Sequence, residues 1–123
     1  MSDTDHPLPP LVRRTLTGPL DGEAFSRALR EVLFCICFQN PHGILIDCRN
    51  ATLSFCSLGD ILDIVRNIAP FRPNRPVRIA QIANPADLEQ LRLLRLLETV
   101  LEMEGFAYRF FVDPEEALAW LGE

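Results

Sequence analysis

Short apolar runs alternate with stretches of helical periodicity along this chain. The apolar runs at residues 11–17, 44–47, 77–82 and 107–112 have the length and composition of strands. Between them, apolar residues recur at helical spacing, as in the stripe Phe25, Ala28, Leu29, Val32, Leu33 and Ile36. A strand–helix repeat requires right-handed crossovers between parallel strands. The sequence therefore predicts an α/β fold, with a mainly parallel sheet of about four strands packed with helices.

The predicted helices begin at residues whose side chains cap helix N-termini. These caps are Asp21, Ser57, Asn84 and Asp113. The last two are each followed by proline, which favours the first helical position. For the second helix, the predicted inner stripe is Leu58, Ile61, Leu62, Val65 and Ile68. In the short terminal helix, Trp120 is expected to be largely buried.

Length and composition predict one domain. The chain has 123 residues, 48% of them hydrophobic and 24% charged, which is typical of a soluble globular protein. Residues 1–10 are interpreted as a Pro-rich tail and residues 11–123 as the domain. No apolar run approaches the ~20 residues of a membrane span, and the N-terminus does not resemble a signal peptide, so a cytoplasmic location is expected. The net charge of −5 argues against nucleic acid as the main partner.

The residue inventory removes several classes of catalysis. All twelve basic residues are arginines, which excludes Schiff-base chemistry and the P-loop lysine. His6 and His42 have no acid placed to orient them as a catalytic base. The four cysteines match no metal-ligand spacing, so they are interpreted as reduced thiols, and neither a metal nor a cofactor is expected. An enzyme is therefore the least favoured class.

Polar residues cluster after the second predicted strand. The run Ile44–Asp47 ends in an acid and leads into a predicted loop, residues 48–56, before the helix that Ser57 opens. Because the carboxyl ends of parallel strands share one edge of a sheet, these residues are expected to line one crevice with the cap of the third helix. The candidate partner- or ligand-binding residues are Asp47, Asn50, Ser54, Ser57 and Asn84. The alternative interpretation is that these side chains only cap helices and turns.

Two surface features suggest further contacts. A local excess of positive charge comes from Arg66, Arg72, Arg75 and Arg78, which is typical either of an anion-binding patch or of an ordinary solvated surface. The Leu-rich helix after residue 84 has a wide apolar arc. Packing against the sheet explains most of this arc, and a homodimer contact through its margin stays open.

Three segments, in the same order along the chain, resemble STAS domains, the anti-sigma-factor-antagonist fold. Leu16–Asp21 is similar to the first strand-to-helix entry of that family. Ile44–Asp47, followed by Leu53-Ser54-Phe55, resembles the central strand and the segment before the regulatory serine. The ending Phe110–Leu121 is similar to the SpoIIAA-like branch, a group of small bacterial proteins.

The resemblance implies a non-catalytic regulatory or protein-interaction module. Its partner would be another protein, such as a serine kinase or an anti-sigma-like regulator, and Ser57 would be the candidate phosphorylation site. The family motif Asp-Ser-Ser-Gly is degenerate here, because Ser57 follows Phe55-Cys56 and precedes Leu58-Gly59. The alternative function is a small-molecule or lipid carrier that uses a cavity between the helices and the sheet.

Overall fold

The strands form one wholly parallel sheet in the order β1-β2-β3-β4, in a computed structural model that describes residues 11–53 and 57–122. The strands are β1 (Leu11–Leu20), β2 (Gly43–Leu53), β3 (Arg78–Ile82) and β4 (Ala107–Phe111). A helix follows each strand, which confirms the predicted α/β class. The second predicted strand, β2, lies inside the sheet between β1 and β3.

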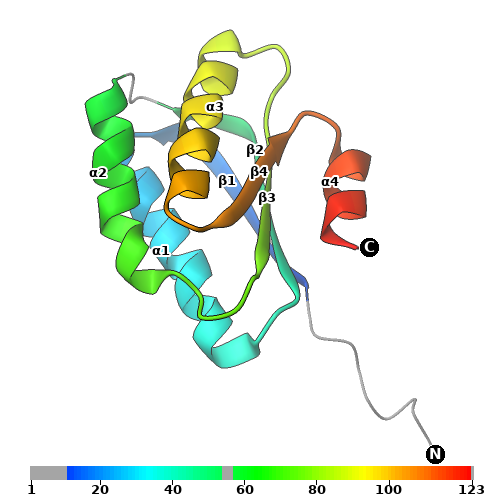
Figure 1. Ribbon diagram of the computed structural model, residues 1–123. Coiled ribbons are helices and arrows are strands. Elements are labelled where there is room, and N and C mark those ends of the chain that lie inside the picture. The colour runs from blue at the N-terminus through cyan, green and yellow to red at the C-terminus, as the bar shows by residue number, and fades with distance from the viewer. Residues whose placement is uncertain (1–10, 54–56, 123) are drawn as a thin grey trace, which may run out of the picture.

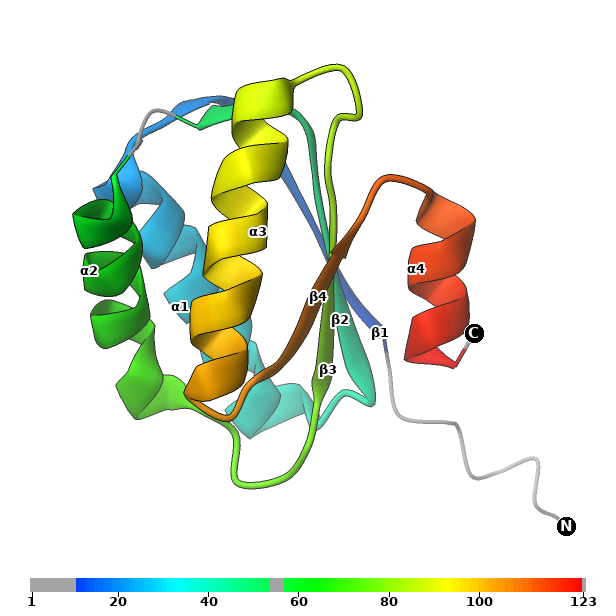
Figure 2. The same ribbon diagram turned by 45° about the horizontal axis from the view of Figure 1, so that its top comes forward.

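The helices divide between the two faces of the sheet. Three of them, α1 (Gly22–Gln39), α2 (Leu58–Ile68) and α3 (Leu88–Met103), cover one face, and α4 (Pro114–Leu121) covers part of the other (Figures 1 and 2). Each crossover advances by one strand in the same direction, so right-handed connections place α1, α2 and α3 on the same side. Because no strand follows α4, this helix is free to fold back over the opposite face.

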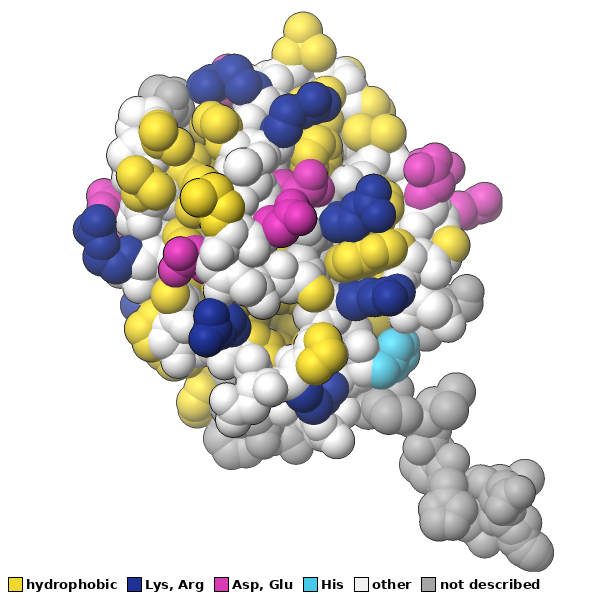
Figure 3. Space-filling view, viewed as in Figure 1, with side chains coloured by type: hydrophobic (Ala, Val, Ile, Leu, Met, Phe, Trp, Pro, Cys, Tyr) yellow, Lys and Arg dark blue, Asp and Glu magenta, His cyan; other side chains and the backbone are white. Residues whose placement is uncertain are grey.

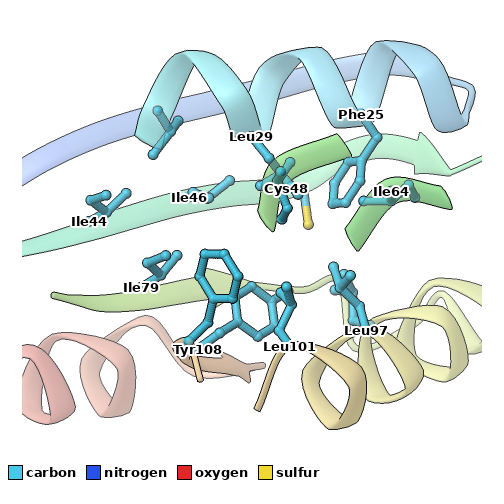
Figure 4. Packing of buried hydrophobic residues seen from close by; sticks show 14 of the residues in the cluster. Phe25, Leu29, Ile44, Ile46, Cys48, Ile64, Ile79, Leu97, Leu101 and Tyr108 are labelled. Atoms are coloured by element: carbon cyan, nitrogen blue, oxygen red, sulfur yellow. The ribbon is translucent and has the colours of Figure 1, made fainter. Parts of the chain in front are cut away.

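The main core lies between the sheet and the three helices on its first face. Figure 4 shows side chains of β2 and β3, such as Ile46 and Ile79, directed toward those of α1, α2 and α3. Here Phe25, Ile64 and Leu97 are almost completely buried. A smaller cluster under α4 consists of Leu45, Ala80, Ile82, Ala117 and Leu121. The sheet is thus a middle layer with apolar contacts on both faces.

The first two strands are longer than predicted. Strand β1 continues past Gly18 and Pro19, and β2 extends through residues 48–53, which the sequence predicts as a loop. The two extensions pair with each other beyond a register shift between Thr15 and Thr17. Gly18 supplies a positive φ of 74° there, and Pro19 is tolerated because β1 is an edge strand. The predicted strand ends at Thr17 and Asp47 are therefore wrong.

Helix α2 has a different inner face from the one predicted. The buried residues are Ile61, Ile64, Val65 and Ile68, whereas Leu58 and Leu62 are 54% and 43% exposed. Both sets of residues fit a helical period. In the structure, the buried set faces the main core. The prediction of Leu58 and Leu62 as core residues is therefore wrong, and Ile64 takes their place.

Trp120 is only partly buried, which corrects the expectation of a largely buried ring. Its indole packs against Phe111, with ring centroids 5.7 Å apart. The guanidinium carbons of Arg78 and Arg109 lie 5.3 and 5.8 Å from its centroid. The ring therefore rests at the margin of the α4 cluster, where cation–π contacts replace part of the expected apolar packing.

The orientation of α2 predicts opposite outcomes for two neighbouring apolar residues. Ile64→Ala should lower the free energy of unfolding by about 2–5 kcal/mol, because it leaves a cavity in the core. Leu62→Ala should change it by about 1 kcal/mol or less, because that side chain is half-exposed. Urea denaturation followed by circular dichroism measures both. A larger loss for Leu62→Ala than for Ile64→Ala would contradict the orientation described here.

Candidate functional site

Ser57 lies where the sequence places it, at the N-cap of α2. Its hydroxyl oxygen accepts a hydrogen bond from the Asp60 backbone N–H at 3.1 Å, and the Asp60 carboxylate accepts one from the Ser57 N–H at 3.3 Å. This reciprocal capping box satisfies two backbone donors of the first helical turn. Ser57 is exposed to solvent. The hydroxyl therefore caps the helix and is also accessible to solvent.

Asp47 lies within β2, and its side chain is on the face of the sheet that α4 covers, opposite the face with Ser57 and α2. Its carboxylate accepts hydrogen bonds from Nη2 and Nε of Arg49 at 2.7 and 3.0 Å, and these bonds hold the pKa of the carboxyl below its usual value. The pair borders a pocket of about 150 Å³ beside the start of α4, where Thr15 and Leu118 also contribute. Asp47 is thus engaged in a local ion pair and does not end the strand.

The remaining predicted site residues have separate environments. Asn50 is exposed on the extension of β2, opposite Thr17, and Ser54 lies outside the described residues. Asn84 does not cap α3. Its side-chain oxygen accepts from the Ala86 N–H at 2.9 Å in a turn, and the cap of α3 is Asp87, which accepts from the Gln90 N–H. The Asn-Pro pair forms a turn first, so the helix begins at Leu88, three residues later than expected.

The described site residues do not converge on one crevice. Asp47 faces the α4 side of the sheet, whereas Ser57 begins a helix on the other side (Figure 2). Crevices at the carboxyl edge of parallel sheets arise where neighbouring crossovers go to opposite faces. Here α1, α2 and α3 all lie on one face, so the topology does not create such a switch point. The expectation of a shared crevice is wrong for Asp47 and Ser57.

A buried hydrogen-bond network lies where the pairing of β2 with β3 ends. The Tyr108 hydroxyl donates to the Gln81 side-chain oxygen, and the Gln81 amide donates to the Cys48 sulfur at 3.3 Å. The Cys48 thiol in turn donates to the Ile82 carbonyl at 3.2 Å. Burial raises the pKa of this thiol to about 11. Cys48 is accordingly a protonated, structural thiol.

Gln90 extends this network to the backbone. Its side-chain amide donates to the carbonyls of Cys48 and Ala51, both at 3.0 Å, and its oxygen accepts from the Asn84 N–H at 2.6 Å. One buried side chain therefore connects β2 to the turn that precedes α3. Gln90 was not identified from the sequence. The position of this polar residue at the start of a buried apolar stripe could have indicated it, because the stripe continues through Leu93, Leu94, Leu97 and Leu101.

The predicted arginine patch is divided among local partners. Arg66 pairs with Asp63, while the other three donate to backbone carbonyls: Arg72 to Glu104, Arg75 to Pro41 and Arg78 to Trp120. These bonds tie the segment after α2 to α3, to the α1–β2 turn and to α4. Three of the guanidinium groups therefore fix connections between elements, and the fourth, that of Arg66, forms an ion pair within α2. The four groups do not point together at one anion site.

Within residues 11–53 and 57–122, no group of three or more His, Cys, Asp or Glu side chains is arranged to hold a metal ion. In the same residues, no helix has the length and apolar character needed to cross a bilayer. Comparisons of the chain with protein-family models, with curated proteins and with solved structures find no match.

The Gln90 contacts predict a specific loss of stability. Gln90→Leu should lower the free energy of unfolding by about 1–3 kcal/mol or more, because buried backbone groups lose their partners. Arg95→Leu, an exposed change on the same helix, serves as the control and should have little effect. Equal denaturation midpoints for the wild type and Gln90→Leu would show that these backbone groups do not depend on the side chain.

Proposed function

We propose that this chain is a non-catalytic regulatory or protein-interaction module of the kind that anti-sigma-factor antagonists represent. Its recognition surface is the exposed side of α2, defined by Ser57, Leu58 and Leu62, which we call the α2 surface. The observation that carries the proposal is the exposure of two leucines one helical turn apart, beside an exposed serine, on a helix whose other side is buried.

The apolar part of the α2 surface continues toward α3. A groove of about 580 Å³ lies between the two helices, and Leu62, Val65 and Val100 contribute to its lining. Figure 3 shows hydrophobic side chains gathered over α2 and α3 on this side of the molecule. Exposed apolar groups that are contiguous and bordered by charges are typical of protein-binding surfaces. A partner that covers Leu58 and Leu62 would gain from removing them from water.

Modification of Ser57 would act on the start of α2. A phosphate at this position gains from the helix dipole and from nearby N–H groups. It would also replace the hydroxyl that accepts from the Asp60 N–H and would lie next to the Asp60 carboxylate, which repels it. Rearrangement of the capping box would couple the charge of Ser57 to the conformation of the first turn, next to Leu58. This coupling is the basis on which the serine would regulate binding.

The carrier alternative gains no support from the described core. The cavity bordered by Leu29, Ile46 and Tyr108, between the helices and the sheet, has a volume of about 10 Å³. A cavity of this size holds at most about one water molecule. A filled interior together with a solvent-facing Ser57 favours the interaction module over a lipid or small-molecule carrier.

The α2 surface predicts which apolar residues a partner protein needs. Leu58→Gln/Leu62→Gln should remove most of the partner that the wild-type chain recovers from host extract. Leu88→Gln/Met103→Gln, which changes two exposed apolar residues at the ends of α3, should recover it normally. Quantitative mass spectrometry of the recovered proteins makes the comparison. Equal loss with both double variants would show that α2 has no special role.

Ser57 variants in the same experiment test the regulatory part of the proposal. Ser57→Asp keeps an acceptor for the Asp60 N–H and adds a charge, so the fold should remain and the recovery of the partner should change. Ser57→Ala should bind in a way that no longer responds to kinase treatment, and it should lose about 1 kcal/mol of stability with the cap. Identical recovery by the wild type, Ser57→Ala and Ser57→Asp would leave Ser57 as a cap alone.

A further inference from the structure

A second groove lies on the other side of α2, between this helix and α1, where no predicted site residue contributes. Its volume is about 530 Å³. The first turns of both helices border it, because α1 and α2 run side by side from the carboxyl edge of the sheet (Figures 1 and 2). We call it the acidic groove because its lining includes Asp21, Glu23, Asp60 and Asp63, with Arg30 as the basic lining residue.

The charge of the acidic groove is only partly balanced. Glu23 pairs with Arg27 at 3.4 Å and Asp63 pairs with Arg66 at 3.0 Å, and all four side chains are more than half exposed. Such surface pairs are weak and compete easily with other cations. Asp21 caps α1 and Asp60 completes the capping box of α2, and both carboxylates accept from backbone N–H groups. The lining therefore carries four carboxylates and one guanidinium group.

Ser26 marks the same groove independently. It lines the groove, is only 2% exposed, and carries the one buried side-chain polar atom in the described part of the chain that lacks a hydrogen-bond partner. Serine hydroxyls inside helices commonly donate to the carbonyl four residues earlier, a bond that Ser26 does not make. A buried hydroxyl without a partner lowers stability, and an occupant of the groove that Ser26 lines would supply one.

We propose that the acidic groove binds a basic segment of the partner protein, whose guanidinium or ammonium groups donate to the groove carboxylates and whose neighbouring donors reach Ser26. The proposal rests on the proposed function and deepens it by stating the chemistry of the partner. The described carboxylates do not form a cluster that holds a single metal ion. A series of cations spaced along a chain fits their distribution along two helices better. The partner would thus contact both sides of α2, with apolar groups near Leu62 and basic groups near Asp63.

A purified probe tests this chemistry without knowledge of the partner. An octa-arginine peptide is titrated into the ¹⁵N-labelled full chain at 0.15 M salt, and binding is followed through amide chemical shifts. Glu23→Gln/Asp63→Asn should weaken binding about tenfold. Glu115→Gln/Glu116→Gln changes the net charge equally on α4, which lies on the opposite face, and should weaken it far less. The shifts should concentrate in the first turns of α1 and α2. Equal weakening by both double variants, or shifts spread over α4, would overturn the proposal.

Ser26→Ala separates binding from folding. If an occupant uses the hydroxyl, this variant should bind the peptide several-fold more weakly while its melting temperature stays the same or rises. Unchanged affinity, or a lower melting temperature, would overturn the role of Ser26. Spermine provides the comparison for a small polyamine, and tighter binding of spermine than of the peptide would overturn the assignment to a protein segment.

The experiments distinguish failure of the basic-segment proposal from failure of the interaction-module proposal. Loss of the partner with Leu58→Gln/Leu62→Gln, together with equal peptide binding by the two charge variants, would keep the interaction module and reject its basic partner.

Discussion

The buried side chain of Gln90 sets where α3 lies on the sheet, because it joins this helix to β2 and to the turn before the helix. Its amide donates to two carbonyls of β2 and its oxygen accepts from the backbone before α3, so three segments are fixed by one residue. Parallel strands leave polar backbone groups where their ladders end, and burial of those groups without partners costs stability. Gln90 satisfies them under α3, while Tyr108, Gln81 and Cys48 satisfy each other beside it. Beyond this network β2 ends and leads toward Ser57.

Helix α2 has three sides that serve different purposes. One side, with Ile61, Ile64, Val65 and Ile68, faces the core. The side toward α3 exposes Leu58 and Leu62, and the side toward α1 carries Asp60 and Asp63. The capping box of Ser57 and Asp60 lies at the first turn of the helix. One short helix therefore carries apolar, acidic and hydroxyl groups on neighbouring surfaces.

The order of elements was predictable because it depends on local signals. Asp21, Ser57 and Asp113 each accept a bond from the first turn of their helices, as their sequence context predicts. The length of β2 was not predictable in this way, because residues 48–53 resemble a loop until β1 pairs with them. Leu62 and Ile64 were ambiguous for a related reason, since two stripes on α2 have the same period and only the neighbouring helices choose between them.

The candidate site was less predictable than the fold. Ser57 was found from its position before a helix, but its relation to Asp47 depends on which face each crossover takes. Ser26 carries no sequence signal, because a serine among apolar residues of a helix is common. Only burial without a partner singles it out. The prediction that Asn84 caps α3 was wrong because an Asn-Pro pair favours both a helix cap and a turn, and here it forms the turn.

The most direct measurement places a photoreactive amino acid at position 62 on α2 or at position 119 on α4, in the native host, followed by irradiation of intact cells. Both positions are exposed, and they lie on opposite sides of the sheet. If α2 is the recognition surface, position 62 should yield a discrete covalent adduct with one partner protein, and position 119 should not. An adduct from position 119 alone, or equal adducts from both positions, would contradict the account.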